Sequence, residues 1–194
     1  SSPDNVVEVK KIDGIKVEQV IIGSCTNSSY KDLALVAMIL RSNKPKAELS
    51  INPGSINVVR NLEREGLFDS IKNSARICDA ACLGCIGMGQ EPKPNSVSLR
   101  TFNRNFSGRS GTENDNVYLC SVETAVASAV KGSITDPRKL GKYPKIELPA
   151  KFDTDKKIFA MPSNNPEKIK LVRGKSIKPV PIKGPLAQTL FGNI

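Results

Sequence analysis

The fold of this chain is decided by one stretch, residues 17–41, which reads VEQVIIGSCTNSSYKDLALVAMILR. The run from Val17 to Ile22 is rich in β-branched residues and stops at Gly23, a pattern typical of a buried strand and its turn. Apolar side chains then recur at helical spacing within residues 28–41, at Leu33, Val36, Ala37 and Leu40. The stretch therefore predicts a strand, a turn and a helix.

A second unit of the same kind follows directly. Ala47 to Ile51 is predicted to be a strand, and Pro53-Gly54 is predicted to be the turn after it. Ile56, Val59 and Leu62 then fall on one face of a helix that should close at Gly66.

Three more strands and one more helix are predicted further along the chain. The strands are expected at residues 76–81, 97–102 and 117–120. Ser121 is a suitable N-cap for a helix that should end at Gly132. Alternating strands and helices predict an α/β domain with a mostly parallel sheet flanked by helices, in which ligands gather at the carboxyl ends of strands.

The character of the chain changes after residue 135. Eight of the thirteen prolines lie from Pro137 onward, and residues 136–194 hold thirteen Lys and Arg against five Asp and Glu. We therefore expect an α/β domain over 1–135 and, over 136–194, an extended Pro- and Lys-rich C-terminal strap or interdomain linker of the same domain. Most of the formal charge of +10 belongs to this strap.

The amino-acid composition disfavours several classes of protein. Histidine is absent, so a metallopeptidase, a zinc hydratase or a hydrolase that uses imidazole is disfavoured. No apolar run approaches the eighteen residues of a membrane span, and the N-terminus lacks a signal-peptide pattern. We expect a location in the cytoplasm, or in the mitochondrial matrix if the source is eukaryotic.

Five cysteines, at 25, 78, 82, 85 and 120, suit thiolate ligation better than a disulfide framework. Cys25 falls near a predicted helix start that favours thiolate, and Cys82 and Cys85 follow another predicted strand as a Cys-x-x-Cys pair. Three thiolates favour an iron-sulfur cluster, whereas zinc would need a fourth cysteine such as Cys78. A small buried Cys25 beside an ordinary redox or zinc pair remains the alternative, and Cys78 and Cys120 are expected to be core residues.

A polar loop follows the strand predicted at 97–102. Guanidinium forks bind carboxylates through paired hydrogen bonds, so Arg104 and Arg109 are candidates to hold an anion that carries several carboxylates. Asn103 could orient a neighbouring group. The alternative is a solvated basic loop or an RNA contact, because Phe102 and Phe106 interleave with Arg and Asn as in stacking platforms.

Three of these segments together resemble the aconitase superfamily. Residues 23–30 (GSCTNSSY) resemble its first cluster-cysteine motif, residues 82–87 its second cysteine pair, and residues 103–109 its substrate-arginine loop. The resemblance extends through the chain to the tail near residues 172–174. One departure is Leu83-Gly84 between the paired cysteines, where the family commonly has Gly-Pro.

The resemblance implies a function and roles for these residues. Cys25, Cys82 and Cys85 would hold a [4Fe-4S] cluster with one open iron, Arg104 and Arg109 would bind substrate carboxylates, and Asn103 would lie in the shell around the cluster. The implied reaction isomerises citrate to isocitrate through cis-aconitate. Homoaconitase and isopropylmalate isomerase share these motifs, although Ser28-Ser29-Tyr30 favours aconitase proper.

The resemblance also implies that other aconitase domains are partners of this one. The family needs Asp/His pairs and a serine base, and a chain without histidine cannot contain those pairs. We therefore expect the third domain of a four-domain enzyme, inactive alone. An RNA-binding module is the rival from another class. Most of the charge lies in the Pro-rich strap, which would more simply pack on acidic neighbouring domains or stay solvated, so a nucleic-acid partner is the weaker prediction.

Overall fold

The computed structural model describes residues 3–104, 106, 108–154, 162, 164–168 and 170. The chain divides into two compact units, Ser1–Asp155 and Lys156–Ile194. In the second unit the described structure is one 3-10 helix, η6 (Pro166–Lys168). Most of the predicted strap, including residues 172–174, lies outside the described residues, so its boundary and extended form stay a prediction.

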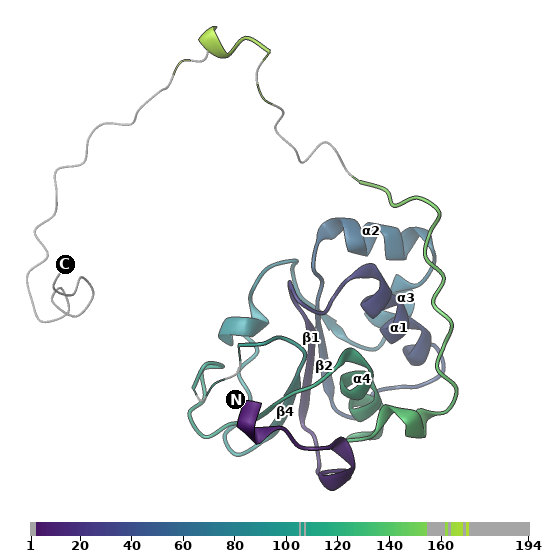
Figure 1. Ribbon diagram of the computed structural model, residues 1–194, viewed down its shortest axis with the longest axis vertical. Coiled ribbons are helices and arrows are strands. Elements are labelled where there is room, and N and C mark those ends of the chain that lie inside the picture. Colours follow the sequence, from purple (N-terminus) through teal and green to yellow (C-terminus); the bar gives the residue numbers. More distant parts are fainter. Residues whose placement is uncertain are drawn as a thin grey trace, which may run out of the picture. The chain divides into compact units, whose positions relative to one another are not determined.

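The first unit is an α/β fold, as predicted (Figure 1). Its sheet contains five parallel strands in the order β3-β2-β1-β4-β5. The strands are β1 (Gln19–Gly23), β2 (Glu48–Asn52), β3 (Arg76–Ile77), β4 (Val97–Arg100) and β5 (Asn116–Leu119). The helices are α1 (Tyr30–Leu40), α2 (Ile56–Arg64), α3 (Phe68–Lys72) and α4 (Val122–Lys131), with short 3-10 turns η1 (Pro3–Asn5), η2 (Val9–Lys11), η3 (Gly84–Ile86) and η4 (Pro137–Leu140).

Helix boundaries follow local capping. Ser29 caps α1 in a capping box with Asp32, which explains why this helix begins two residues later than predicted. Ser121 caps α4 through the Thr124 amide, and Gly132 closes it in the left-handed conformation, both as predicted. Helix α3 was not predicted, because five residues are too few to show a helical period.

Two strand predictions were too long. β3 ends at Ile77 rather than 81, since it pairs only with Ser50 and Ile51 of β2 before the chain leaves the sheet. β4 ends at Arg100 rather than 102, where Thr101 and Phe102 turn out of the sheet. Both strands thus end just before the segments that carry the predicted site residues.

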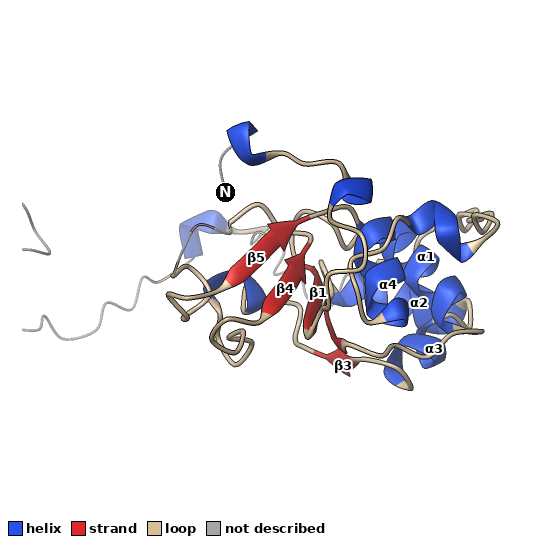
Figure 2. Ribbon diagram, turned by 90° about the horizontal axis from the view of Figure 1, so that it is seen from below, coloured by secondary structure: helices blue, strands red, loops and turns tan. Residues whose placement is uncertain are grey.

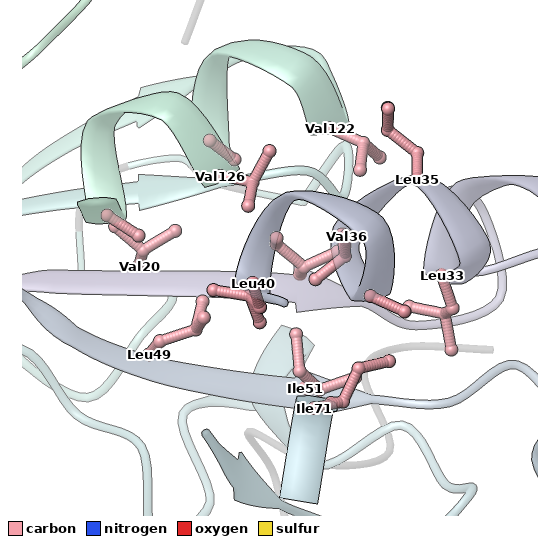
Figure 3. Close-up of a cluster of buried hydrophobic side chains, with 14 of the residues drawn as sticks. Val20, Leu33, Leu35, Val36, Leu40, Leu49, Ile51, Ile71, Val122 and Val126 are labelled. Atoms are coloured by element: carbon pink, nitrogen blue, oxygen red, sulfur yellow. The ribbon is translucent and has the colours of Figure 1, made fainter. Parts of the chain in front are cut away.

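All four α-helices lie on one side of the sheet (Figure 2). Their apolar side chains form a single core with alternate residues of the strands, part of which is drawn in Figure 3. Val20 and Ile22 of β1 and Ile51 of β2 are fully buried in this core. The helix-covered face therefore supplies most of the hydrophobic stabilisation.

The opposite face of the sheet is covered by loops. It buries a much smaller apolar cluster, Ile21, Cys85 and Phe102, and the neighbouring strand positions on this face are polar. The loops that cover it follow β3 and β4, and they include η3. This loop-covered face is where the predicted site residues collect.

The first part of the predicted strap packs on the helices. The Phe152 ring meets the Tyr30 ring edge-on, with centroids 5.3 Å apart. Asp153 N–H donates to Asn61 Oδ1 (2.8 Å), Asn61 Nδ2 donates to the Asp153 carbonyl (2.9 Å), and Arg64 donates to the Lys151 carbonyl (2.9 Å). This segment is tied to α1 and α2. Among the described residues, no helix combines the length and apolar character that crossing a membrane requires.

Candidate functional site

The predicted site residues lie in three loops at one edge of the sheet. Cys25 follows β1, Cys82 and Cys85 follow β3, and Asn103, Arg104 and Arg109 follow β4. Because all five strands are parallel, these loops leave from the same carboxyl edge. The topology therefore brings together residues that are separated by up to 84 positions in sequence.

The Cys25 loop is held by Thr101, at the start of the arginine loop. Gly23 N–H donates to Thr101 Oγ1 (3.0 Å), and this hydroxyl donates back to the Gly23 carbonyl (2.9 Å). Asn27 Nδ2 donates to the Thr101 carbonyl, and Ser28 Oγ donates to the Ser24 carbonyl. These contacts fix a tight turn and leave Cys25 exposed at its tip.

Hydroxyl groups surround the Cys25 thiol. Its sulfur lies 3.7 Å from Thr26 Oγ1, and the hydroxyls of Thr26 and Ser24 lower the pKa of Cys25. Ser24 Oγ is buried and makes no hydrogen bond to another described residue, so it is free to donate to a thiolate. The sequence predicted a helix start as the cause. The helix begins at Tyr30 after its Ser29 cap, and the groups that lower the pKa of Cys25 are mainly the two hydroxyls.

The paired cysteines occupy a tight loop around η3. Cys85 is buried against Ile21 and Phe102, whereas Cys82 is exposed. Burial raises the pKa of the Cys82 thiol, and the adjacent Cys85 thiol and the nearby Cys25 thiol raise it further. The Cys82 thiol is thus within electrostatic reach of both other thiols. That all three converge on one ligand stays a prediction.

The cysteine thiols at this edge are the kind of donor that an iron-sulfur cluster takes. Within the described residues, no three His, Cys, Asp or Glu side chains are arranged to hold one metal ion. A cluster makes a different demand, because each thiolate binds a separate iron and the sulfurs stand farther apart than around one ion. The buried Asn52 side chain, whose amide would lie 3.0 Å from a Cβ at Gly84, has no hydrogen-bond partner among the described residues and offers a donor to cluster sulfur.

The arginine loop packs directly on the paired-cysteine loop. Arg109 Nε donates to the Cys85 carbonyl (3.1 Å), and its guanidinium lies 5.8 Å from the Phe106 ring centre. A Cβ on Gly87 would come within 2.2 Å of the Ser110 carbonyl oxygen, so only glycine permits this close approach. The hydrogen bond and the close approach of Gly87 to Ser110 therefore hold Arg109 against the backbone of the paired-cysteine loop.

Asn103 and Arg104 are exposed at the same edge. Their place after β4 agrees with the predicted loop, while Asn105 and Ser107 between them and Arg109 lie outside the described residues. The other two cysteines have different surroundings. Cys120 follows β5, and burial raises its pKa to about 12; Cys78, half-buried, accepts a hydrogen bond from Gln90 Nε2 (3.3 Å).

Sequence reasoning missed a buried polar network beneath the paired-cysteine loop. Gln19 of β1 and Ser98 and Arg100 of β4 are at most 7% exposed and point to the loop-covered face. The signal was present, because polar residues at alternate positions of strands in a buried parallel sheet are unusual. Such residues need partners, and here the loop backbone supplies them.

Comparison with known proteins agrees with this geometry. Residues 4–132 match the sequence profile of the aconitase family (aconitate hydratase). The chain belongs to the aconitase family. The match spans the cysteine and arginine loops and ends at the close of α4.

Similar proteins include 3-isopropylmalate dehydratase large subunits. Those of Methanoregula boonei and Pyrococcus horikoshii are each 40% identical to this chain, over 141 and 138 residues. That of Archaeoglobus fulgidus is 39% identical over 142 residues. The alignments cover 70–71% of this chain and 34–36% of each relative, so the chain spans about a third of their length.

Proposed function

We propose that this chain carries the [4Fe-4S] site and the substrate-binding arginines of an aconitase-family hydro-lyase. One observation carries the proposal: the Cys25 loop and the paired-cysteine loop leave the same carboxyl edge of the sheet, where the Cys25 and Cys85 thiols both act on the Cys82 thiol, and Arg109 donates a hydrogen bond to the Cys85 carbonyl. Cysteine thiolates, which bind soft metals, and an arginine, which binds carboxylates, therefore lie in neighbouring loops. This combination suits a cluster that handles a carboxylic acid.

Each cysteine has a distinct setting for ligation. Cys25 stands at the tip of a turn fixed by Thr101, with two hydroxyls that favour its thiolate. Cys85 anchors its loop in the apolar cluster, and Cys82 faces outward. When bound, a cluster with one iron free of protein ligands supplies a Lewis acid for a substrate hydroxyl and carboxylate.

The arginines bind and orient the substrate. Arg109 uses Nε on the Cys85 carbonyl, which leaves its terminal nitrogens for a carboxylate held at a fixed angle to the thiols. Arg104 is exposed and supplies a second fork. Asn103, also exposed, lies beside them as a further donor. Two forks at one edge favour a substrate with at least two carboxylates.

For the substrate we propose citrate, isomerised to isocitrate through cis-aconitate. The sequence argument from Ser28-Ser29-Tyr30 is weakened, because Ser28 and Tyr30 are buried and Ser29 caps α1. The names of the relatives favour a second candidate, a 3-isopropylmalate-type acid. The two substrates differ in that citrate carries a third carboxylate where 3-isopropylmalate carries an isopropyl group.

Proton transfer must come from groups outside this chain. The sequence contains no histidine to serve as acid or base, and the exposed edge leaves room for other domains of the enzyme. We therefore propose that the isolated chain binds the cluster and the acid but does not turn substrate over. Steady consumption of cis-aconitate by the pure, iron-loaded chain would contradict this assignment of roles.

The test is substrate binding by the anaerobically reconstituted chain. Citrate and 3-isopropylmalate are titrated separately while the electron paramagnetic resonance spectrum of the reduced cluster is recorded. We expect citrate to perturb the spectrum and Arg109→Gln to weaken its binding at least about tenfold. A response to 3-isopropylmalate alone would move the proposal to that acid, and no response to either acid would overturn it.

A further inference from the structure

Arg100 of β4 is fully buried beneath the paired-cysteine loop. Its guanidinium donates to four acceptors within 3.5 Å: Ser98 Oγ (3.1 Å), the Gly84 carbonyl (3.3 Å), Gln19 Oε1 (3.4 Å) and the Gln90 carbonyl (3.1 Å). The Phe102 ring centre lies 5.7 Å from its central carbon. A charged side chain is seldom buried to this degree without a specific role.

The two carbonyls that Arg100 binds stand at either end of one segment. Gly84 lies between Cys82 and Cys85, and Gln90 closes the turn that follows. One side chain on a rigid strand thus fixes the segment that carries Cys85. Gln19 supports the arrangement, since its Nε2 also donates to the Gln90 carbonyl (3.3 Å) and its Oε1 accepts from Ser98 (2.7 Å).

The four acceptors that bind the Arg100 guanidinium do not neutralise its positive charge. All four are neutral, and among the described residues no carboxylate forms an ion pair with it. Asp115, Cys85 and Glu91 are the acidic groups that act on it from a distance. Burial lowers the pKa of Arg100 to about 10, so the group stays charged at neutral pH. A buried cation of this kind is costly unless negative charge lies nearby.

We propose that Arg100 is a positioning residue of the cluster site, which clamps the paired-cysteine loop and supplies a buried positive charge beside Cys85. This inference rests on the proposed function, because the thiolate-bound cluster would add negative charge near the cation beyond that of Asp115 and Glu91. The buried cation favours the more negative, reduced cluster and therefore raises its reduction potential. The clamp holds Cys85 in place and slows cluster loss.

A purely structural network would behave differently. If Arg100 only satisfied loop carbonyls, its replacement would lower stability but leave the potential of any assembled cluster unchanged. The reduction potential responds to a nearby buried charge, whereas packing alone does not set it. The potential therefore separates the two roles.

The experiment compares four forms of the full 194-residue chain after anaerobic loading with iron and sulfide: unaltered, Arg100→Gln, Arg100→Lys and Arg76→Gln. Arg76 is the matched control, because it also donates to a carbonyl of the same segment, at Gly89 (3.0 Å), but from an exposed position. Solvent screens its charge. The readouts are the cluster potential, the rate of iron loss to a chelator, and thermal unfolding.

We expect Arg100→Gln to give a more negative potential and about tenfold faster iron loss. Arg100→Lys keeps the charge and should keep the potential near that of the unaltered chain, with intermediate iron loss because the fork is gone. Arg76→Gln should match the unaltered chain in both. If Arg100→Gln fails to fold, the Lys variant and the control still decide. A cluster potential in the folded Lys variant that is clearly more negative than those of the unaltered chain and of Arg76→Gln would overturn the proposal, because the buried charge is retained.

Two kinds of failure are distinguishable. If the unaltered chain takes up no cluster, the proposed function fails before Arg100 is tested. If the unaltered chain and Arg100→Gln assemble clusters with the same potential and the same rate of iron loss, the proposed function stands and the role of Arg100 is refuted.

Discussion

The two faces of the sheet are built from the same strands yet hold opposite kinds of side chain. The residues that face the helices are apolar: Val20, Ile22, Leu49, Ile51 and Leu99. The residues that alternate with them are mainly polar although buried: Gln19, Ser50, Asn52, Ser98 and Arg100. A sheet with both faces covered usually has continuous apolar strands, so the difference needs a cause.

The cause lies in what covers each face. Helices satisfy their own backbone groups and present apolar side chains, so the strand positions beneath them are apolar. Loops carry carbonyls without partners of their own, and the strands beneath them must donate, as Arg100 does to Gly84 and Gln90. The helix-covered face therefore provides most of the hydrophobic stabilisation, and the loop-covered face carries the candidate site residues.

The largest effect on stability is expected on the helix-covered face. Leu33 of α1 is fully buried in the core, and Leu33→Ala should lower the free energy of unfolding by about 3 kcal/mol, because it leaves a cavity. Urea unfolding measures the loss. Cluster uptake by the fraction that remains folded should be unchanged, and impaired uptake by a folded variant would show that the two faces are not separable.

Gly87→Ala tests the loop-covered face at a single contact. Gly87 has φ of 75°, and a Cβ there meets Ser110, so we expect a loss of about 2 kcal/mol and defective cluster uptake. Gly66→Ala is the control, since Gly66 also has positive φ (64°) but open space around it. It should cost about 1 kcal/mol and leave uptake intact. Equal uptake in the two variants would contradict the packing of the two loops.

Helix caps give a smaller effect on the helix-covered side. Ser121 Oγ accepts from the Thr124 amide at the start of α4, and Ser121→Ala should lower the free energy of unfolding by about 1 kcal/mol. Ser121→Asp should restore most of it, because aspartate also caps. Denaturant titrations of both variants provide the measurement, and a cost that aspartate does not relieve would argue against capping.

The smallest effect concerns pH, at the start of η4. Arg138 beside Asp136 lowers the pKa of that carboxyl to about 2 in the folded chain. Because the folded value lies below the unfolded value of about 3.9, this contribution is fully present above that unfolded value and is lost as pH falls toward 2. In the Asp136→Asn variant, the free energy of unfolding should therefore fall slightly less steeply as pH is lowered from about 4 to 2. An unchanged slope would show that the pair contributes nothing measurable.

Much of the fold was predictable because its signals are local. Apolar periodicity located β1, α1, β2 and α2, and serine and glycine caps located α4. The ends of β3 and β4 were not predictable, since the chain leaves the sheet there through pairing and loop contacts between distant residues.

The candidate site was predictable in part for a related reason. Cys25, Cys82 and Cys85 stand in motifs with clear spacing, and parallel strands bring their loops to one edge. The setting of each thiol was not predicted: the hydroxyls of Thr26 and Ser24 act on Cys25, and Arg100 supports the paired-cysteine loop. Alternating polar residues in the strands could have indicated a buried network, but its partner, the Gly84 carbonyl, is set by a contact between distant residues.

The most direct test of the account is a count of iron and acid-labile sulfide in the anaerobically reconstituted chain and in single serine variants of all five cysteines. We expect about four of each per chain, with loss in the variants of Cys25, Cys82 and Cys85 and retention in those of Cys78 and Cys120. Absence of a cluster from the unaltered chain, or a cluster that survives the loss of Cys25 and depends on Cys78, would contradict the assignment of the loop-covered face as a three-cysteine [4Fe-4S] site.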